Sequence, residues 1–159
     1  MKKNALKIVV VAIVALCSTA CTKDAVINNN GITTGNSDNF VWTENDNTFA
    51  TANIIKCDSA YASAQFKTIF VYKGPAVTKY YFEINLSSLA VASYSVNTAN
   101  QVTYLRPGSL LLAGFGGAID ITANANNKIT GTGVISLPFA ASGSTTSRVY
   151  IKFTDLIVK

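Results

Sequence analysis

The sequence predicts an all-β domain, an antiparallel sandwich of two sheets. Apolar and polar residues alternate with a period of two in several segments, a pattern that places one strand face in a core and the other in water. Turn-forming residues separate these segments at intervals of roughly 8–12 residues, as in sandwiches and barrels. No segment after residue 40 keeps helical periodicity over three turns. We therefore expect one sandwich domain over residues 40–159, immunoglobulin-like or similar, with a closed β-barrel as the alternative.

The strands can be assigned from this alternation. In residues 79–86 every even-numbered position is apolar, while the odd-numbered positions include Lys79, Glu83 and Asn85. Residues 148–153 repeat the pattern, and residues 129–137 follow it with glycine at two inward positions, which indicates a bulge, a bend or close backbone approach. The other expected strands are residues 40–43, 51–57, 66–73, 94–97, 101–106, 110–113 and 118–123. Residues 58–65 fit either a short helix capped by Asp58 or a loop.

The first 20 residues have the layout of a secretory signal peptide, with lysines, then an apolar run over residues 8–16, then small residues. The apolar run is shorter than the roughly 20 residues that a membrane-spanning helix needs. Cys21 follows Ala20 and resembles the cysteine of a bacterial lipobox, whereas Cys17 follows the bulky Leu16. We expect residues 1–20 to be removed and Cys21 to be lipidated. Plain secretion after cleavage near Ala20 is the alternative.

Residues 21–39 contain the lipidated cysteine and a polar stretch rich in Asn, Gly, Thr and Ser. Such a composition does not bury enough apolar surface to order itself, so it predicts a flexible tether. The leader holds three of the 13 basic residues, which leaves 10 basic against 8 acidic residues in the rest of the chain. The remaining lysines and arginines are scattered, which excludes the concentrated basic surface of a nucleic-acid-binding protein.

Three short motifs follow the tether. Residues 40–43 read Phe-Val-Trp-Thr, residues 83–89 read Glu-Ile-Asn-Leu-Ser-Ser-Leu and lead to Ser93-Tyr94, and residues 128–133 read Lys-Ile-Thr-Gly-Thr-Gly. With the lipobox and the polar tether, this layout resembles the small β-rich lipoproteins of Bacteroidota. The resemblance covers most of the mature chain and implies a β-rich domain anchored by lipid to the outer membrane. The family has no assigned chemistry to transfer.

Residues for metal binding and catalysis are few. The chain has no histidine, and Cys57 in a strand is expected to be a small buried apolar residue, so zinc, copper and thiol chemistry are excluded. Residues 44–47 (Glu-Asn-Asp-Asn) are interpreted as a solvated polar hairpin rather than a calcium loop. We expect no metal, no cofactor and no enzymatic activity. A glycan-active hydrolase using Glu83 or Asp120 is the alternative, and it requires the two carboxylates to lie about 5–10 Å apart in one cleft.

Aromatic side chains are the better lead to function, because ring faces stack on the apolar faces of sugars. Candidate ligand contacts come from Trp42, Tyr61, Tyr72, Tyr81, Tyr104 and Tyr150. Trp42 and Tyr81 lead this set, Tyr81 because it occupies an outward position between Lys79 and Glu83. Residues 58–60 (Asp-Ser-Ala) resemble the tripeptide to which Bacteroidota attach O-glycans, which makes Ser59 a candidate modification site.

The sequence thus predicts a lipid-anchored cell-envelope protein that acts as a non-catalytic binding or structural module. The expected contacts are the membrane, through the lipid, and a glycan or an envelope protein. Besides the hydrolase, a β-barrel that binds an apolar ligand is an alternative, and it requires a cavity open at one end.

Overall fold

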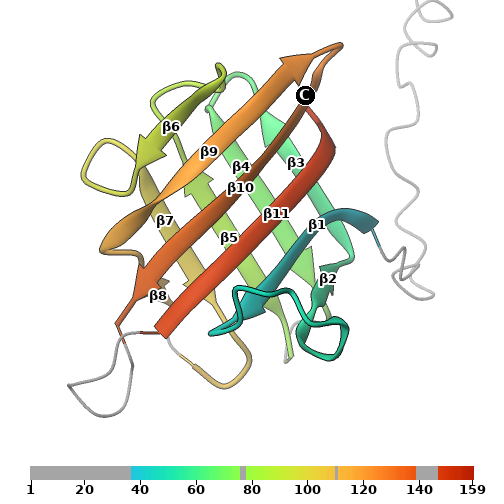
Figure 1. The fold of residues 1–159 in the computed structure, drawn as a ribbon, viewed down its shortest axis with the longest axis vertical. Helices are drawn as coiled ribbons and strands as arrows, with labels where there is room; N and C mark the ends of the chain where they lie inside the picture. Colours follow the sequence, from blue (N-terminus) through green and yellow to red (C-terminus); the bar gives the residue numbers. More distant parts are fainter. Residues whose placement is uncertain (1–36, 76–77, 110, 139–146) are drawn as a thin grey trace, which may run out of the picture. The chain divides into compact units, whose positions relative to one another are not determined.

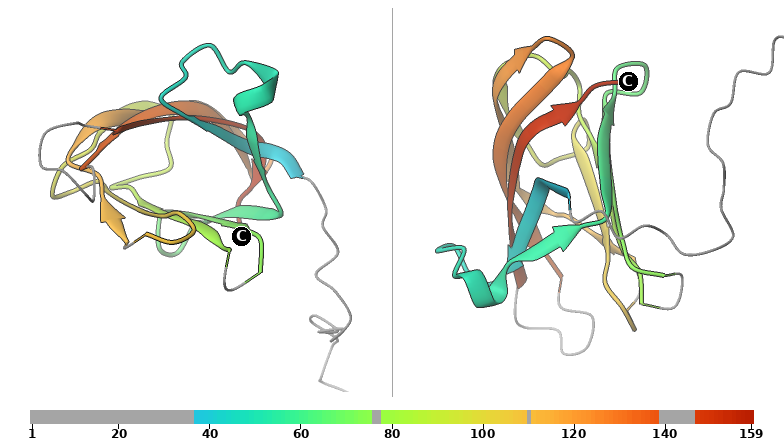
Figure 2. Two further views of the ribbon diagram at one scale, coloured as in Figure 1. Left: turned by 90° about the horizontal axis from the view of Figure 1, so that it is seen from below. Right: turned by 90° about the vertical axis from the view of Figure 1, so that its right-hand side faces the viewer.

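The computed structural model describes residues 37–75, 78–109, 111–138 and 147–159. These residues belong to one compact unit, Thr34–Lys159. They form two antiparallel sheets packed face to face, and the sheets do not close into a barrel (Figures 1 and 2). The predicted all-β sandwich is confirmed, and the closed-barrel alternative is wrong. The leader, Cys21 and the tether up to residue 36 lie outside the described residues. In the described part of the chain, no helix has the length and apolar character needed to cross a membrane.

Each sheet has a simple order of strands. Sheet A contains, side by side, β2 (Ile55–Cys57), β1 (Ser37–Glu44), β11 (Ser147–Ile157), β10 (Lys128–Leu137), β9 (Gly116–Ala125) and β6 (Ala92–Ser95). Sheet B contains β3 (Ser59–Ser63), β4 (Thr68–Lys73), β5 (Tyr80–Asn85), β7 (Gln101–Leu105) and β8 (Leu112–Ala113). Figure 2 shows the two layers edge-on. The chain crosses from sheet A to sheet B between β2 and β3, where a single residue, Asp58, links the two strands.

Three segments differ from the sequence-based assignment. Residues 58–65, expected to be a short helix or a loop, contain strand β3. Its inward positions carry the small residues Ala60 and Ala62, which hide the apolar alternation. The expected strand 51–57 is divided into the 3₁₀ helix η1 (Thr51–Asn53) and β2. Strand β1 begins at Ser37, within the stretch assigned to the tether, because Ser37 pairs with Cys57 of β2.

Aromatic side chains fill the centre of the core. Phe82 lies among three of them, with ring centroids 4.3 Å from Tyr104, 5.2 Å from Trp42 and 5.8 Å from Phe40. All four side chains are fully buried. Because Phe40 and Trp42 come from β1 of sheet A and the other two come from sheet B, these contacts join the sheets. Packing of apolar side chains between the layers is the main source of stability in such a fold.

A hydrogen-bonded chain also links the two sheets. The indole Nε1–H of Trp42 donates to the Tyr104 hydroxyl at 3.3 Å, and that hydroxyl donates to the Glu44 carboxylate. The Arg106 guanidinium lies 3.6 Å from the same carboxylate. Burial and the hydrogen bond to Glu44 raise the pKa of Tyr104, so its hydroxyl stays protonated as a donor. The buried polar atoms of Trp42 and Tyr104 are therefore paired rather than left unsatisfied.

The last residues close one corner of the sandwich. Val158 forms a parallel bridge with Ala62 of β3. The Lys159 amide donates to the Ala62 carbonyl, and the Ala64 amide donates to the Lys159 carbonyl, each at 2.8 Å. These bonds join the end of β11 in sheet A to the edge of sheet B.

Candidate functional site

Four aromatic side chains lie on the outer surface of sheet B. They come from three adjacent strands and comprise Tyr61 of β3, Phe70 and Tyr72 of β4, and Tyr81 of β5. We call this set the aromatic face. All four are partly exposed, because the alternate positions of the same strands point into the core. Strand register places Tyr61 opposite Phe70, with ring centroids 5.4 Å apart, and Tyr72 opposite Tyr81, at 5.2 Å. The two ring pairs thus form neighbouring rows.

Polar groups surround these rings. The Glu83 carboxylate accepts a hydrogen bond from the Tyr81 hydroxyl at 2.9 Å and another from the Asn85 amide at 3.1 Å. The Lys79 ammonium lies 5.2 Å from the ring centroids of both Tyr72 and Tyr81. Burial, with help from Glu83, raises the pKa of Tyr81, so its hydroxyl remains a donor. The aromatic face therefore combines ring surfaces with hydrogen-bonding groups at their margin.

The sequence-predicted aromatics divide among three places. Tyr81 lies on the outer surface of sheet B, as its position in the strand predicts. Trp42 has 0% exposure, so the expectation that it contacts a ligand is wrong. Tyr104 is buried beside it, and Tyr150 lies on the outer surface of sheet A, opposite Thr43 of β1. Sequence reasoning missed Phe70, whose outward position follows from its alternation with buried Ile69 and Val71.

The structure separates the two carboxylates considered for glycan hydrolysis. Glu83 lies on the outer surface of sheet B, opposite Phe70 and Thr103. Asp120 lies on β9 of sheet A, between the inward-facing Ile119 and Ile121. The two carboxylates therefore occupy opposite outer surfaces of the sandwich and do not share a cleft, which removes the pair on which the hydrolase alternative depended.

The candidate modification site Ser59 and the cysteine Cys57 both lie in the described part of the chain. Ser59 is exposed on β3, directly opposite Tyr72, so an attached glycan would lie beside the aromatic face. Asp58 before it accepts a hydrogen bond from the Gly74 amide at 2.7 Å, which fixes the turn into sheet B. Modification of Ser59 stays a prediction. Cys57 is fully buried, in agreement with its expected role as a small apolar residue.

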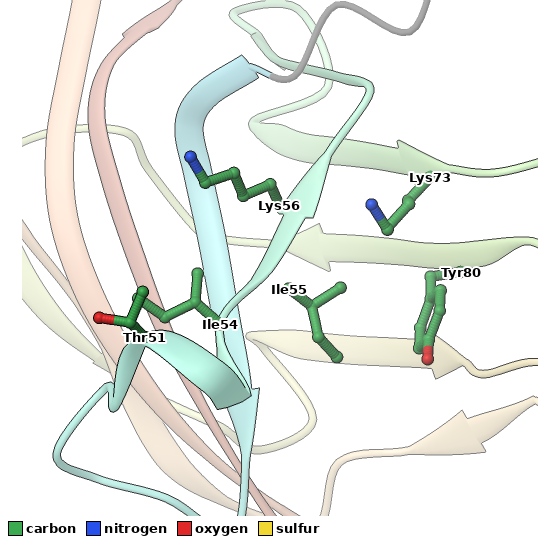
Figure 3. Close-up of a pocket in the computed structure, with 6 residues that line it drawn as sticks. All are labelled: Thr51, Ile54, Ile55, Lys56, Lys73 and Tyr80. Carbon is green, nitrogen blue, oxygen red and sulfur yellow. The ribbon is translucent and has the colours of Figure 1, made fainter.

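A pocket of about 430 Å³ opens between the edge strand β2 and the end of the β4–β5 hairpin. We call it the β2 pocket, and its lining is mainly apolar. The lining residues are Thr51, Ile54, Ile55, Lys56, Lys73 and Tyr80. Figure 3 shows Lys73 and Tyr80 on one side of this pocket and the residues from the η1–β2 segment on the other.

Asp46 organises, through hydrogen bonds, the loop that leads into the η1–β2 segment of the pocket lining. Its Oδ1 accepts hydrogen bonds from the amide and hydroxyl of Thr48, and its Oδ2 accepts from the Ala50 amide at 3.0 Å and the Asn53 side chain at 2.8 Å. Both carboxylate oxygens of Asp46 thus accept hydrogen bonds from groups of the chain itself. This arrangement agrees with the interpretation of residues 44–47 as a polar hairpin. Among the described residues, no group of three or more His, Cys, Asp or Glu could hold a metal ion.

These hydrogen bonds, led by that from the Thr48 hydroxyl, lower the pKa of Asp46 from 3.8 to about 2. Because the pKa is lowered in the folded state, the stabilisation by this carboxylate is complete above pH 3.8 and is lost as the pH falls through about 2. We expect NMR titration of the Asp46 carboxyl carbon to show a midpoint near pH 2. A midpoint near 3.8 would mean that the carboxylate does not organise the loop.

Comparisons with known proteins gave no relative for this chain: no family model, no curated protein and no solved structure matched it. Only the residues of the chain itself therefore indicate a function.

Proposed function

We propose that this protein is a lipid-anchored module of the cell envelope that binds glycans through the aromatic face, without catalysis. The single observation that supports the proposal is the pair of ring rows on the outer surface of sheet B, with Glu83 and Asn85 at their margin. Ring faces pack against the C–H faces of sugar rings, while carboxylate, amide and hydroxyl groups bond to sugar hydroxyls. Because the rings belong to hydrogen-bonded strands, little ordering is needed when a ligand binds.

Alanine substitutions on the aromatic face test this proposal. We expect a Tyr72→Ala/Tyr81→Ala double variant to bind glycan at least about tenfold more weakly, since each stacked ring contributes roughly 0.5–1.5 kcal/mol beyond its buried area. The measurement is a glycan array of neutral and uronate-containing envelope polysaccharides, followed by calorimetry on the glycans that bind. The double variant and the parent protein should be full-length chains with the same circular dichroism spectrum.

Tyr150→Ala is the matched control, because Tyr150 is a partly exposed tyrosine on the outer surface of the other sheet. We expect this control to bind glycan as the parent protein does. Equal binding by the double variant and the parent protein, or equal losses in the double variant and the control, would refute a site on the aromatic face.

The lipid anchor is tested separately. Each buried methylene of an acyl chain contributes about 0.8 kcal/mol to membrane binding, so two or three chains hold a protein firmly. We expect Cys21→Ala to move the protein from the membrane fraction to the soluble fraction. Cys17→Ala is the control and should leave the protein with the membrane. Retention of the Cys21→Ala variant in the membrane fraction would show that the anchor is not a lipid on Cys21.

A partner protein of the envelope is a second candidate ligand, and exposed apolar side chains support it. Phe66, Val91 and Ile157 are 65%, 59% and 50% exposed. Each is next in sequence to a residue of one shallow hollow, which is lined in part by Lys67, Ala90 and Val158. Exposed large apolar side chains near a hollow are a feature of surfaces that contact other proteins. Loss of a captured envelope protein on Phe66→Ser, with glycan binding intact, would favour this second site.

A further inference from the structure

The β2 pocket has a floor of aromatic and aliphatic side chains. Tyr80 forms part of it, and the same ring packs edge-on against buried Trp42, with centroids 5.5 Å apart. Ile55 lines the pocket from β2, where it pairs with Trp42 in the strand register. The floor is thus the outer end of the aromatic core, held in place by packing from both sheets. A rigid apolar surface of this kind favours a ligand with a flat or aliphatic body.

Lys73 places a positive charge at this apolar site. The buried residues Ile69 and Val71 precede it on the inward side of β4, so Lys73 continues the inward row and extends from its strand toward the β2 side of the pocket (Figure 3). Among the described residues its ammonium forms no ion pair. The second lysine of the pocket, Lys56, forms an ion pair with Asp38 at 2.7 Å, and both of these side chains are exposed. An apolar ligand without charge would cover the Lys73 ammonium and leave it without a partner, whereas an anion would compensate it.

We propose that the β2 pocket binds an anionic amphiphile, a small molecule with an apolar body and one carboxylate, sulfonate or phosphate group that pairs with Lys73. This site is independent of the aromatic face, because Lys73 and Tyr80 point inward while Tyr72 and Tyr81 point outward from the same hairpin. The volume of about 430 Å³ is within the range of small-molecule sites.

Two fluorescent probes that differ in one charged group test the proposal. 8-Anilinonaphthalene-1-sulfonate has the anion, and N-phenyl-1-naphthylamine has the same rings without it. We expect Lys73→Gln in the full-length chain to weaken binding of the sulfonate probe about fivefold to tenfold, and to change the affinity for the neutral probe by less than about twofold. Lys73→Arg keeps the charge and should restore binding of the sulfonate probe.

Lys128→Gln is the control for net charge, because Lys128 lies at the β9–β10 turn and is not part of the pocket. It should leave both affinities unchanged. Four results would overturn the proposal. The first is that the sulfonate probe does not bind the parent chain, and the second is that it binds Lys73→Gln and the parent chain with equal affinity. The third is that Lys128→Gln weakens binding of the sulfonate probe as much as Lys73→Gln does. The fourth is that Lys73→Gln weakens binding of both probes equally.

Discussion

Replacing Gly131 with alanine is expected to lower the free energy of unfolding by about 3 kcal/mol, the upper part of the range for adding atoms to a filled core. A Cβ atom at this position would lie 2.1 Å from the backbone carbonyl oxygen of Asp120 and 2.5 Å from Cζ of Phe153. A shift of either group would cost free energy, because β9 and β11 are hydrogen-bonded to β10 on its two sides and Phe153 is buried. Urea unfolding, followed by circular dichroism, measures the effect as a lower midpoint.

Gly116→Ala is the matched control for this prediction. The nearest heavy atom to a Cβ at Gly116 is the Ser136 Cβ, 4.0 Å away, so the methyl group meets no obstacle. We expect its unfolding midpoint to stay close to that of the parent protein or to rise slightly, since alanine restricts the unfolded chain. Similar midpoints for Gly131→Ala and Gly116→Ala would contradict the close approach of β9 and Phe153 to Gly131.

Phe82→Ala has the second large expected effect. This ring contacts three buried aromatic rings from both sheets, so its removal leaves a cavity that the neighbouring strands cannot fill. Truncation of a buried phenylalanine costs about 3–5 kcal/mol, which is a large fraction of the stability of an average domain. We expect a much lower urea midpoint for Phe82→Ala, or loss of the cooperative transition.

Phe66→Ala provides the comparison, because it removes the same atoms from a side chain that is 65% exposed. Its effect should stay within about 0.5 kcal/mol, as for most surface substitutions. Equal destabilisation by the two variants would show that Phe82 does not occupy the centre of the core.

The sequence contains most of the fold, because strands leave a local signal. Alternation over residues 79–86 predicts β5 and the outward position of Tyr81, and both agree with the structure. The glycines in residues 129–137 predict a bulge or a close approach, and β10 has both. Its register with β9 shifts between Thr130 and Gly131. These features depend on neighbours in sequence and are therefore visible without a structure.

Other features depend on residues far apart in the chain. Strand β3 leaves little local signal in the sequence, since its inward alanines give almost no apolar contrast with their neighbours. The burial of Trp42 is one of these features, because a residue type alone does not show which face of a sheet it occupies. The β2 pocket joins residues 51–56 to Lys73 and Tyr80 across two sheets, and no local pattern in the sequence marks that contact.

An NMR titration of the isotope-labelled protein with a glycan that binds it tests the proposed site most directly. We expect chemical-shift changes to concentrate on the outward residues of β3, β4 and β5, above all Tyr61, Phe70, Tyr72 and Tyr81. Signals from the outer surface of sheet A, such as that of Tyr150, should stay unchanged. Shift changes centred on sheet A or on the β2 pocket, with none on the aromatic face, would contradict glycan binding at this surface.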